Sequence, residues 1–269
     1  MPELPEVEVT RRGIAPCVVG RRITSVAVRE ARLRWPVPAA VRRLAGRMVR
    51  AVNRRGKYLL LDCGDGHLIL HLGMSGSLRL VDAGTPPGRH DHVDIALGRR
   101  LLRLRDPRRF GAVLWTTGAP GAHPLLRRLG VEPLSPAFDA ACLRALCRGR
   151  RTSIKQLLMD GRLIVGVGNI YASESLFLSG IHPRRRAGTL SAERCRWLVA
   201  SVKQVLRAAI RAGGSTLRDF VGGDGASGYF QAQHLVYGRA GGPCRRCGAP
   251  VRRLVQGQRA TYYCAKCQR

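Results

Sequence analysis

Four cysteines near the C-terminus constrain the fold of this chain more than any other feature of its sequence. They form two C-x2-C pairs separated by sixteen residues, Cys244 with Cys247 and Cys264 with Cys267. Each pair can place two thiolates on one side of a tight turn, and two such turns on a hairpin complete a tetrahedral site. Four thiolates leave no position open for a substrate water, so the sequence predicts one structural Zn²⁺. The alternative is two disulfides or four unligated thiols.

Five further cysteines have no metal-like spacing, and we interpret them as ordinary small thiols: Cys17, Cys63, Cys142, Cys147 and Cys195. The total is odd, and the first residues carry acids rather than a basic region ahead of an apolar block. This pattern argues against a secretory signal and favours a reducing cytoplasm, where clustered cysteines bind metal more often than they form disulfides.

Basic residues dominate the chain as a whole. Lys and Arg total 47 against 17 Asp and Glu, a formal net charge of +30 that is spread along the sequence. Such an excess repels itself in a compact fold and is best explained by a polyanionic partner. A genome rich in G and C also favours arginine codons, but that bias exchanges Lys for Arg and does not remove acids. We therefore expect a nucleic acid as partner, ahead of an anionic membrane surface or compositional drift.

The cysteine-bearing tail shares this charge, with seven cations and no acid in residues 244–269. A hairpin held by metal, with Arg259 at its turn, suits a DNA groove or backbone. No apolar run in the chain is long enough to cross a bilayer.

The sequence divides into a β-rich first part, a helical middle and the cysteine module. Short apolar or alternating runs fill residues 21–115 and are broken by Gly, Asp and Pro, which predicts an antiparallel sandwich or barrel. The runs are RITSVAVRE, KYLLLDC, HLILHL, DHVDIAL and AVLW. A helix is expected before them, over residues 6–19, with Pro5 in its first turn.

Helical patterns begin after residue 136. We expect short helices around Leu143 and over SIKQLLMD, and another from about Asn169 to Gly180. The clearest helix follows Ser191, a good N-cap, and keeps the i, i+3, i+4 apolar rhythm up to Gly213.

The opening residues, MPELPEVE, admit two interpretations. Removal of the initiator methionine would leave Pro2 as a secondary amine. An α-amino group has a pKa of about 7.7–8.0, so a usable fraction could attack a sugar carbon and form an iminium. Glu3 could then shuttle protons. Alternatively, Pro and acids in a first turn only favour the start of a helix.

Several motifs occur together in one order: MPELPEVE, HLGMSGSL (71–78), DPRRFGA (106–112), GVGNIYASE (166–174), VYGR (236–239) and the terminal cysteine pairs. In this combination the chain closely resembles the bacterial formamidopyrimidine-DNA glycosylases, bifunctional repair enzymes for oxidised purines. The resemblance covers essentially the whole chain, and we find no departure at the catalytic positions.

The resemblance implies an α+β fold with an N-terminal helix plus antiparallel β-sandwich, a helical domain with a helix-two-turn-helix, and a C-terminal zinc-ribbon finger. The implied domains are residues 1–132, 133–228 and 229–269. It also implies a monomer that acts in the bacterial cytoplasm, associated with the nucleoid. The implied partner is double-stranded DNA that contains oxidised bases or abasic sites.

The resemblance further implies the catalytic residues. Pro2 would displace the damaged base and hold the sugar as a Schiff base, Glu3 would take part in proton transfer, and successive β- and δ-elimination would cut the strand. Lys57 would contact a phosphate and assist the chemistry, and Arg259 would grip a phosphate near the lesion.

DNA-binding residues are implied in the same way. A flipped-out nucleotide leaves a void in the stack, which Met74, Arg108 and Phe110 would fill, with Arg108 facing the orphaned cytosine. Without the resemblance, Met74 and Phe110 would be interpreted as core residues. The remaining implied contacts are Asn169 at a helix start that suits a phosphate, Lys155 near the damaged base, and His90, Arg109 and Arg150.

Residues 218–229 (RDFVGGDGASGY) match the segment that closes over the damaged base, and their glycines suit a mobile lid. Two rival functions stay open. One is an endonuclease VIII-type glycosylase for oxidised pyrimidines, against which Leu4 and the Met74–Arg108–Phe110 set argue. The other is a zinc-ribbon DNA-binding protein without catalysis.

Overall fold

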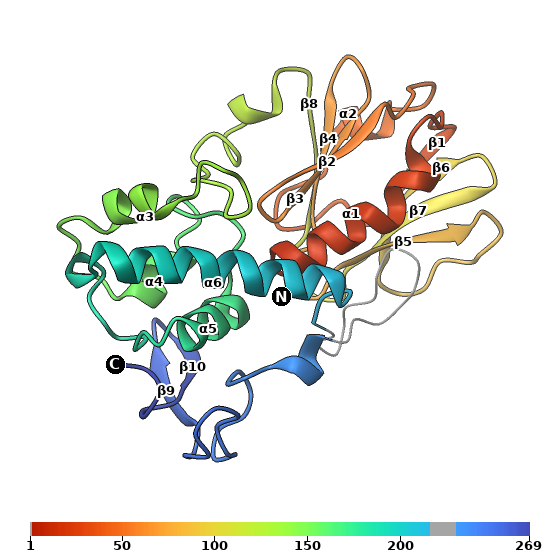
Figure 1. The fold of residues 1–269 in the computed structure, drawn as a ribbon. Coiled ribbons are helices and arrows are strands. Elements are labelled where there is room, and N and C mark those ends of the chain that lie inside the picture. The colour runs from red at the N-terminus through yellow and green to blue at the C-terminus, as the bar shows by residue number, and fades with distance from the viewer. Residues whose placement is uncertain (1, 216–229) are drawn as a thin grey trace. The chain divides into compact units, whose positions relative to one another are not determined.

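The structure is a computed structural model that describes residues 2–215 and 230–269 (Figure 1). The chain forms two compact units, Met1–Arg128 with Ile210–Gln231 and Leu129–Ala209 with Ala232–Arg269. Helices and antiparallel sheets are both present, so the expected α+β class is confirmed. Among the described residues, no helix has both the length and the hydropathy that a bilayer crossing requires.

The first unit begins with helix α1, Leu4–Val18. Pro5 lies in its first turn, as expected, because a missing N–H costs nothing where that group has no intrahelical partner. The helix starts two residues earlier than the sequence predicts because Glu3, with an extended backbone, acts as the N-cap. One face of α1 is buried through Leu4, Val7, Ile14 and Val18.

Two four-stranded antiparallel sheets follow, with strand orders β1-β6-β7-β5 and β2-β3-β4-β8. Each expected run of residues 21–115 contains one strand, and β2, β5 and β7 lie outside these runs. The short helix α2, Ala39–Arg42, lies between β1 and β2. The strands are β1 Ser25–Val28, β2 Ala51–Arg55, β3 Tyr58–Asp62, β4 His67–His71, β5 Ser77–Asp82, β6 Asp91–Leu97, β7 Arg100–Arg105 and β8 Ala112–Thr116.

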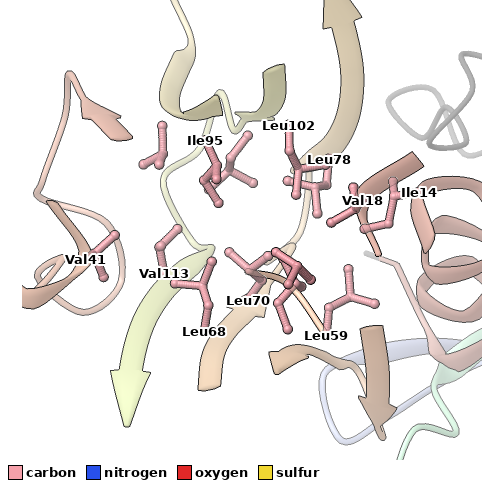
Figure 2. Close-up of a cluster of buried hydrophobic side chains, with 14 of the residues drawn as sticks. Ile14, Val18, Val41, Leu59, Leu68, Leu70, Leu78, Ile95, Leu102 and Val113 are labelled. Atoms are coloured by element: carbon pink, nitrogen blue, oxygen red, sulfur yellow. The ribbon is translucent and has the colours of Figure 1, made fainter. Parts of the chain in front are cut away.

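The two sheets enclose one apolar core, so the predicted sandwich is confirmed (Figure 2). One sheet contributes side chains such as Leu59, Leu68 and Val113, and the other contributes Leu78, Ile95 and Leu102. Side chains of α1 complete the same cluster. Removing this much apolar surface from water is the main stabilisation of the unit.

The second unit carries the helices of the chain's middle part. Asp139 caps α3 by accepting from Cys142 N at 2.7 Å, and Ser153 caps α4. Helix α6 belongs to this unit as far as Ala209. The helices are α3 Ala140–Cys147, α4 Ile154–Met159, α5 Asn169–Leu178 and α6 Ala192–Arg211, and they match the four that the sequence predicts. Single turns of 3₁₀ helix lie at Pro120–Ala122, Ala187–Thr189 and Phe230–Gln233.

A two-stranded hairpin ends the chain, with β9 at Arg252–Gln256 and β10 at Arg259–Tyr263. A small apolar cluster lies beside the hairpin, in which Phe177 of α5 packs with Val236, Val251, Cys244 and Cys264. Strand β10 packs against α5, so the cysteine module is joined to the helices of its own unit.

Candidate active site and metal centre

The start of α1 holds Pro2 and Glu3 in a buried position. Glu3 N donates to Glu6 Oε2 at 2.7 Å, and Ser215 N donates to Glu6 Oε1 at 2.9 Å. The Glu6 carboxylate therefore fixes the backbone directly after Pro2. The sequence analysis assigned no role to Glu6, although the spacing of Glu3 and Glu6 is that of a capping box.

Lys57 lies in the turn between β2 and β3, whose last and first residues, Arg55 and Tyr58, pair across it. Its charge acts on His71, at the end of β4. Burial, then the charges of Lys57 and Arg34, lower the pKa of His71 to about 4. His71 Nδ1 accepts from Gly73 N at 3.0 Å, so the neutral ring carries its proton on Nε2. Sequence reasoning missed His71.

Two loops present the expected void-filling side chains. Met74, in the loop between β4 and β5, is 41% exposed, and Phe110, in the loop between β7 and β8, is 42% exposed. Neither is a core residue. The guanidinium of Arg108 lies 4.9 Å from the centre of the Phe110 ring. The loops approach so closely that a side chain on Gly73 would lie 2.5 Å from the Phe110 carbonyl carbon and Gly111 N.

Arg109 lies in the second loop, and His90 lies beside it. Arg109 has a positive φ of 56°, an uncommon conformation for a residue with a side chain. Its guanidinium donates to Glu30 at 3.1 Å. His90 contributes its carbonyl, which accepts from Asp106 N at 2.9 Å. Both residues are therefore held in the same unit as Met74.

Lys155 is 1% exposed and lies on α4 of the second unit. Its ammonium donates to Asn169 Oδ1 at 2.5 Å and to Thr261 Oγ1 at 2.7 Å, with Ala260 O at 3.4 Å. Lys155 thus joins α4, the first residue of α5 and strand β10. Its placement near a damaged base stays a prediction, whereas this internal role was missed.

Asn169 and Arg259 lie on the elements that Lys155 connects. Asn169 is the first residue of α5, and its Nδ2 donates to Ala260 O at 2.9 Å. Arg259 begins β10, directly after the hairpin turn. A pocket of about 220 Å³ opens beside this network and is lined by Lys155, Gln156, Met159, Asp160, Gln256, Gly257 and Arg259. Lys155 and Arg259 give this pocket a basic wall.

The four clustered cysteines converge at the base of the hairpin. Their sulfur atoms all lie within 4.8 Å of one another, with Cys244 Sγ 3.9 Å from Cys267 Sγ and Cys247 Sγ 3.5 Å from Cys264 Sγ. Tetrahedral zinc with Zn–S bonds of about 2.3 Å requires sulfurs roughly 3.8 Å apart. The residues fit one structural Zn²⁺, as predicted. The remaining five cysteines are free thiols.

A buried carboxylate ties α5 to the segment that leads into the cysteine module. Glu174 Oε2 accepts from Leu235 N at 2.8 Å, and Oε1 accepts from Val236 N at 3.0 Å and Tyr237 N at 2.8 Å. Burial raises the pKa of Glu174, and the three N–H donors oppose this effect. Sequence reasoning missed Glu174, although it ends the GVGNIYASE motif.

Arg150 and the expected lid are the two predicted features not yet placed. Arg150 follows α3, is exposed, and donates from Nε to Leu146 O at 2.7 Å. The lid expected over residues 218–229 lies outside the described residues.

Models of three protein families match the chain in sequence order. The formamidopyrimidine-DNA glycosylase N-terminal domain matches residues 1–113, and the formamidopyrimidine-DNA glycosylase H2TH domain matches residues 129–221. A zinc finger found in FPG and IleRS matches residues 241–269. The helix-two-turn-helix and the zinc finger that the sequence implied are therefore both present.

Full-length relatives and solved structures agree with these matches. A formamidopyrimidine-DNA glycosylase of Aromatoleum aromaticum is 60% identical, and one of Methylococcus capsulatus is 59% identical, each over all of both chains. The MutM (FPG) protein of Thermus thermophilus has a TM-score of 0.90 and 41% identity over 99% of this chain and 98% of that chain. A Lactococcus lactis FPG mutant in complex with Fapy-dG-containing DNA has a TM-score of 0.92 and 33% identity over all of both chains.

The buried Pro2–Glu3 start, the paired loops and the four-sulfur site thus occur in a chain that matches these proteins from end to end. This chain belongs to the formamidopyrimidine-DNA glycosylase family.

Proposed function

We propose that this DNA glycosylase of base excision repair is bifunctional. It removes oxidised purines, 8-oxoguanine and formamidopyrimidines, from double-stranded DNA and then cuts the strand at the abasic site. The observation that carries the proposal is the buried Pro2–Glu3 pair, fixed through Glu6 at the head of α1, in a chain related over its full length to formamidopyrimidine-DNA glycosylases.

Pro2, exposed as a secondary amine by removal of Met1, is the proposed nucleophile. Its nitrogen bonds to C1′ of the damaged nucleotide while the glycosidic bond breaks, and the base leaves with a proton that Glu3 helps to deliver. Opening of the sugar gives an iminium. Loss of a C2′ proton then expels the 3′ phosphate, and a second elimination expels the 5′ phosphate. Water finally releases Pro2 from the sugar remnant.

Cationic residues hold the strand during these steps. Lys57 and Arg259 bind phosphates near the lesion, and Asn169 offers a phosphate the start of α5, where free N–H groups favour anions. Lys155 supports this second group by holding Asn169 and Thr261 in place. His90, Arg109 and Arg150 contact the DNA backbone elsewhere.

Met74, Arg108 and Phe110 fill the void that the extruded nucleotide leaves. The exposure of Met74 and Phe110 and the close approach of the two loops that carry them support this role. The proposal also includes a monomer in the bacterial cytoplasm that associates with the nucleoid, with domains at residues 1–132, 133–228 and 229–269.

A second substrate class has one specific observation in its favour. The wild-type Lactococcus lactis FPG (MutM), 33% identical with a TM-score of 0.90, was solved in complex with DNA that contains an oxidised pyrimidine. Oxidised pyrimidines are therefore included as a minor substrate, and the endonuclease VIII-type preference becomes an outcome of the test.

Borohydride trapping tests the chemistry, because reduction of the iminium leaves a stable protein–DNA crosslink. Wild-type protein is expected to crosslink to and nick duplex DNA with 8-oxoguanine, and to do so less with an oxidised pyrimidine. Pro2→Gly should still bind this DNA but lose most nicking, about 100-fold or more. Undiminished nicking and crosslinking by Pro2→Gly would show that the secondary amine of Pro2 is not required, and no crosslink by wild type would leave a DNA-binding protein without catalysis.

A further inference from the structure

The two loops that carry the void-filling side chains lie side by side because of the sheet topology. Residues 72–76 connect β4 to β5, and residues 106–111 connect β7 to β8. Strands β4 and β8 are neighbours in one sheet, where His71 pairs with Ala112. Strands β5 and β7 are neighbours in the other sheet. Both loops therefore cross from sheet to sheet at the same end of the sandwich.

Asp106 is the residue at which the two loops are joined. It is fully buried, and its carboxylate accepts three hydrogen bonds. Oδ2 accepts from Gly111 N at 2.7 Å, and Oδ1 accepts from Arg108 N at 3.3 Å. The third bond crosses between the loops, since Ser75 Oγ donates to Oδ1 at 3.1 Å. One carboxylate thus holds the residue after Met74 and both ends of the Arg108–Phe110 segment.

The backbone of Asp106 extends this junction. Its N–H donates to His90 O at 2.9 Å, and its carbonyl accepts from Arg109 N at 3.2 Å. The carbonyl also lies 2.8 Å from His92 Nε2. Arg109 has the positive φ noted above, so the bond to Asp106 O helps to keep that residue in a conformation it would otherwise leave.

We propose that Asp106 is a positioning residue that makes Met74, Arg108 and Phe110 act as one unit during extrusion of the damaged base. This inference rests on the proposed function, because it assigns these three side chains to the void. Asp106 itself touches neither the sugar nor the base. Its effect is to fix the spacing of the two loops before DNA arrives, so that ordering them costs little free energy on binding.

The proposal predicts a loss that depends on the substrate. A stacked, paired base must be unstacked before it can be excised, whereas a preformed abasic site has no base to extrude. Misplaced void-filling side chains should therefore slow excision of 8-oxoguanine more than they slow nicking of an abasic site. General damage to the fold would reduce both activities by the same factor.

The test measures the rate of 8-oxoguanine excision divided by the rate of abasic-site nicking. This ratio is compared with wild type in Asp106→Ala, Ser75→Ala and the double variant. Ser75→Ala removes only the bond between the loops and leaves the bonds to Arg108 and Gly111 intact. We expect the ratio to fall about tenfold in Asp106→Ala and about threefold in Ser75→Ala. In the double variant the loss should equal that of Asp106→Ala alone, because the two residues act through one hydrogen bond.

Asp62→Ala is the matched control, since Asp62 Oδ1 accepts from Gly64 N at 2.8 Å in a turn of the same sandwich. Its ratio should equal that of wild type. If thermal unfolding shows that Asp106→Ala does not fold, the activity ratio of Ser75→Ala alone decides whether the inference holds.

Three results would overturn the inference. They are equal losses on both substrates, additive losses in the double variant, and a wild-type ratio in Ser75→Ala. Wild-type protein that neither excises nor nicks would instead overturn the proposed function, and this inference with it.

Discussion

Among single residues, Glu8 shows why carboxylates are buried in so basic a chain. It is 8% exposed and accepts from Arg11 at 2.9 Å, Arg12 at 2.8 Å and Arg54 of β2 at 3.1 Å. Burial raises the pKa of Glu8, but the hydrogen bonds and charges of these arginines lower it to about 2. The ion pair between Glu8 and Arg54 fixes α1 against β2, and α1 carries Pro2 at its head.

Glu8→Gln should therefore change the acid stability of the protein. Because the folded-state pKa is lowered from 4.5 to about 2, the stabilisation is complete above pH 4.5 and is lost as the pH falls toward 2. We expect the variant to lose on the order of 1 kcal/mol at neutral pH, since Arg12 is solvated. The difference in the free energy of unfolding between the variant and wild type should shrink as the pH falls from 4.5 toward 2.

Urea unfolding at several pH values measures this difference. Glu30→Gln is a control, because both arginine partners of Glu30, Arg32 and Arg109, are exposed, and it should change the stability little. A constant gap between wild type and Glu8→Gln from neutral pH down to pH 2 would contradict the assignment.

At the scale of elements, the β9–β10 hairpin cannot be stable by itself. It has two strands of five residues each, and Thr261 is the one strand residue that is fully buried. An isolated two-stranded hairpin is marginal in water. The four-sulfur site at its base therefore supplies the missing stabilisation, and through Thr261 and Ala260 it also maintains the partners of Lys155.

Cys247→Ser should release zinc and weaken DNA binding, because the hairpin that carries Arg259 is no longer held closed. We expect at least a tenfold loss of affinity, measured together with the metal content by elemental analysis. Cys142→Ser is the matched control, since this thiol lies on α3 and outside the sulfur cluster, and it should keep both properties. A metal-free Cys247→Ser with wild-type affinity would show that the hairpin does not depend on zinc.

For the molecule as a whole, the net charge of +30 determines how DNA is approached. Neutralisation of phosphates releases counterions, so the affinity falls with salt in proportion to the number of phosphates contacted. Side chains that fill a void contribute to affinity without releasing ions. The salt dependence of the affinity can therefore separate the residues that contact phosphates from the apolar side chains that fill the void.

Arg259→Ala should reduce the slope of log affinity against log salt concentration by about one. Met74→Ala should reduce the affinity for lesion DNA but leave the slope unchanged, which makes it the internal control. Fluorescence anisotropy over a range of salt concentrations measures both. Equal slopes for Arg259→Ala and wild type would remove Arg259 from the phosphate contacts.

Sequence reasoning succeeded where the physical signal is local. Pro5 in a first turn, the helix start at Asn169 and the C-x2-C pairs act over a few residues, so α1, α5 and the zinc site follow from short patterns. Strands that contain several arginines were missed, such as β7 with the sequence RLLRLR, whose Arg103 is buried beside Asp94. A strand signal depends on packing against neighbours, which a single run does not reveal.

The amino-acid sequence by itself thus determined the helices, the metal site, the basic character and, through its motifs, the family. Only the tertiary structure decided which distant side chains meet. Asp106 joins Ser75 across 31 residues, Glu174 accepts from a segment 61 residues away, and Lys155 reaches Thr261 across 106 residues. Such contacts follow from how distant elements pack together, which no local pattern encodes.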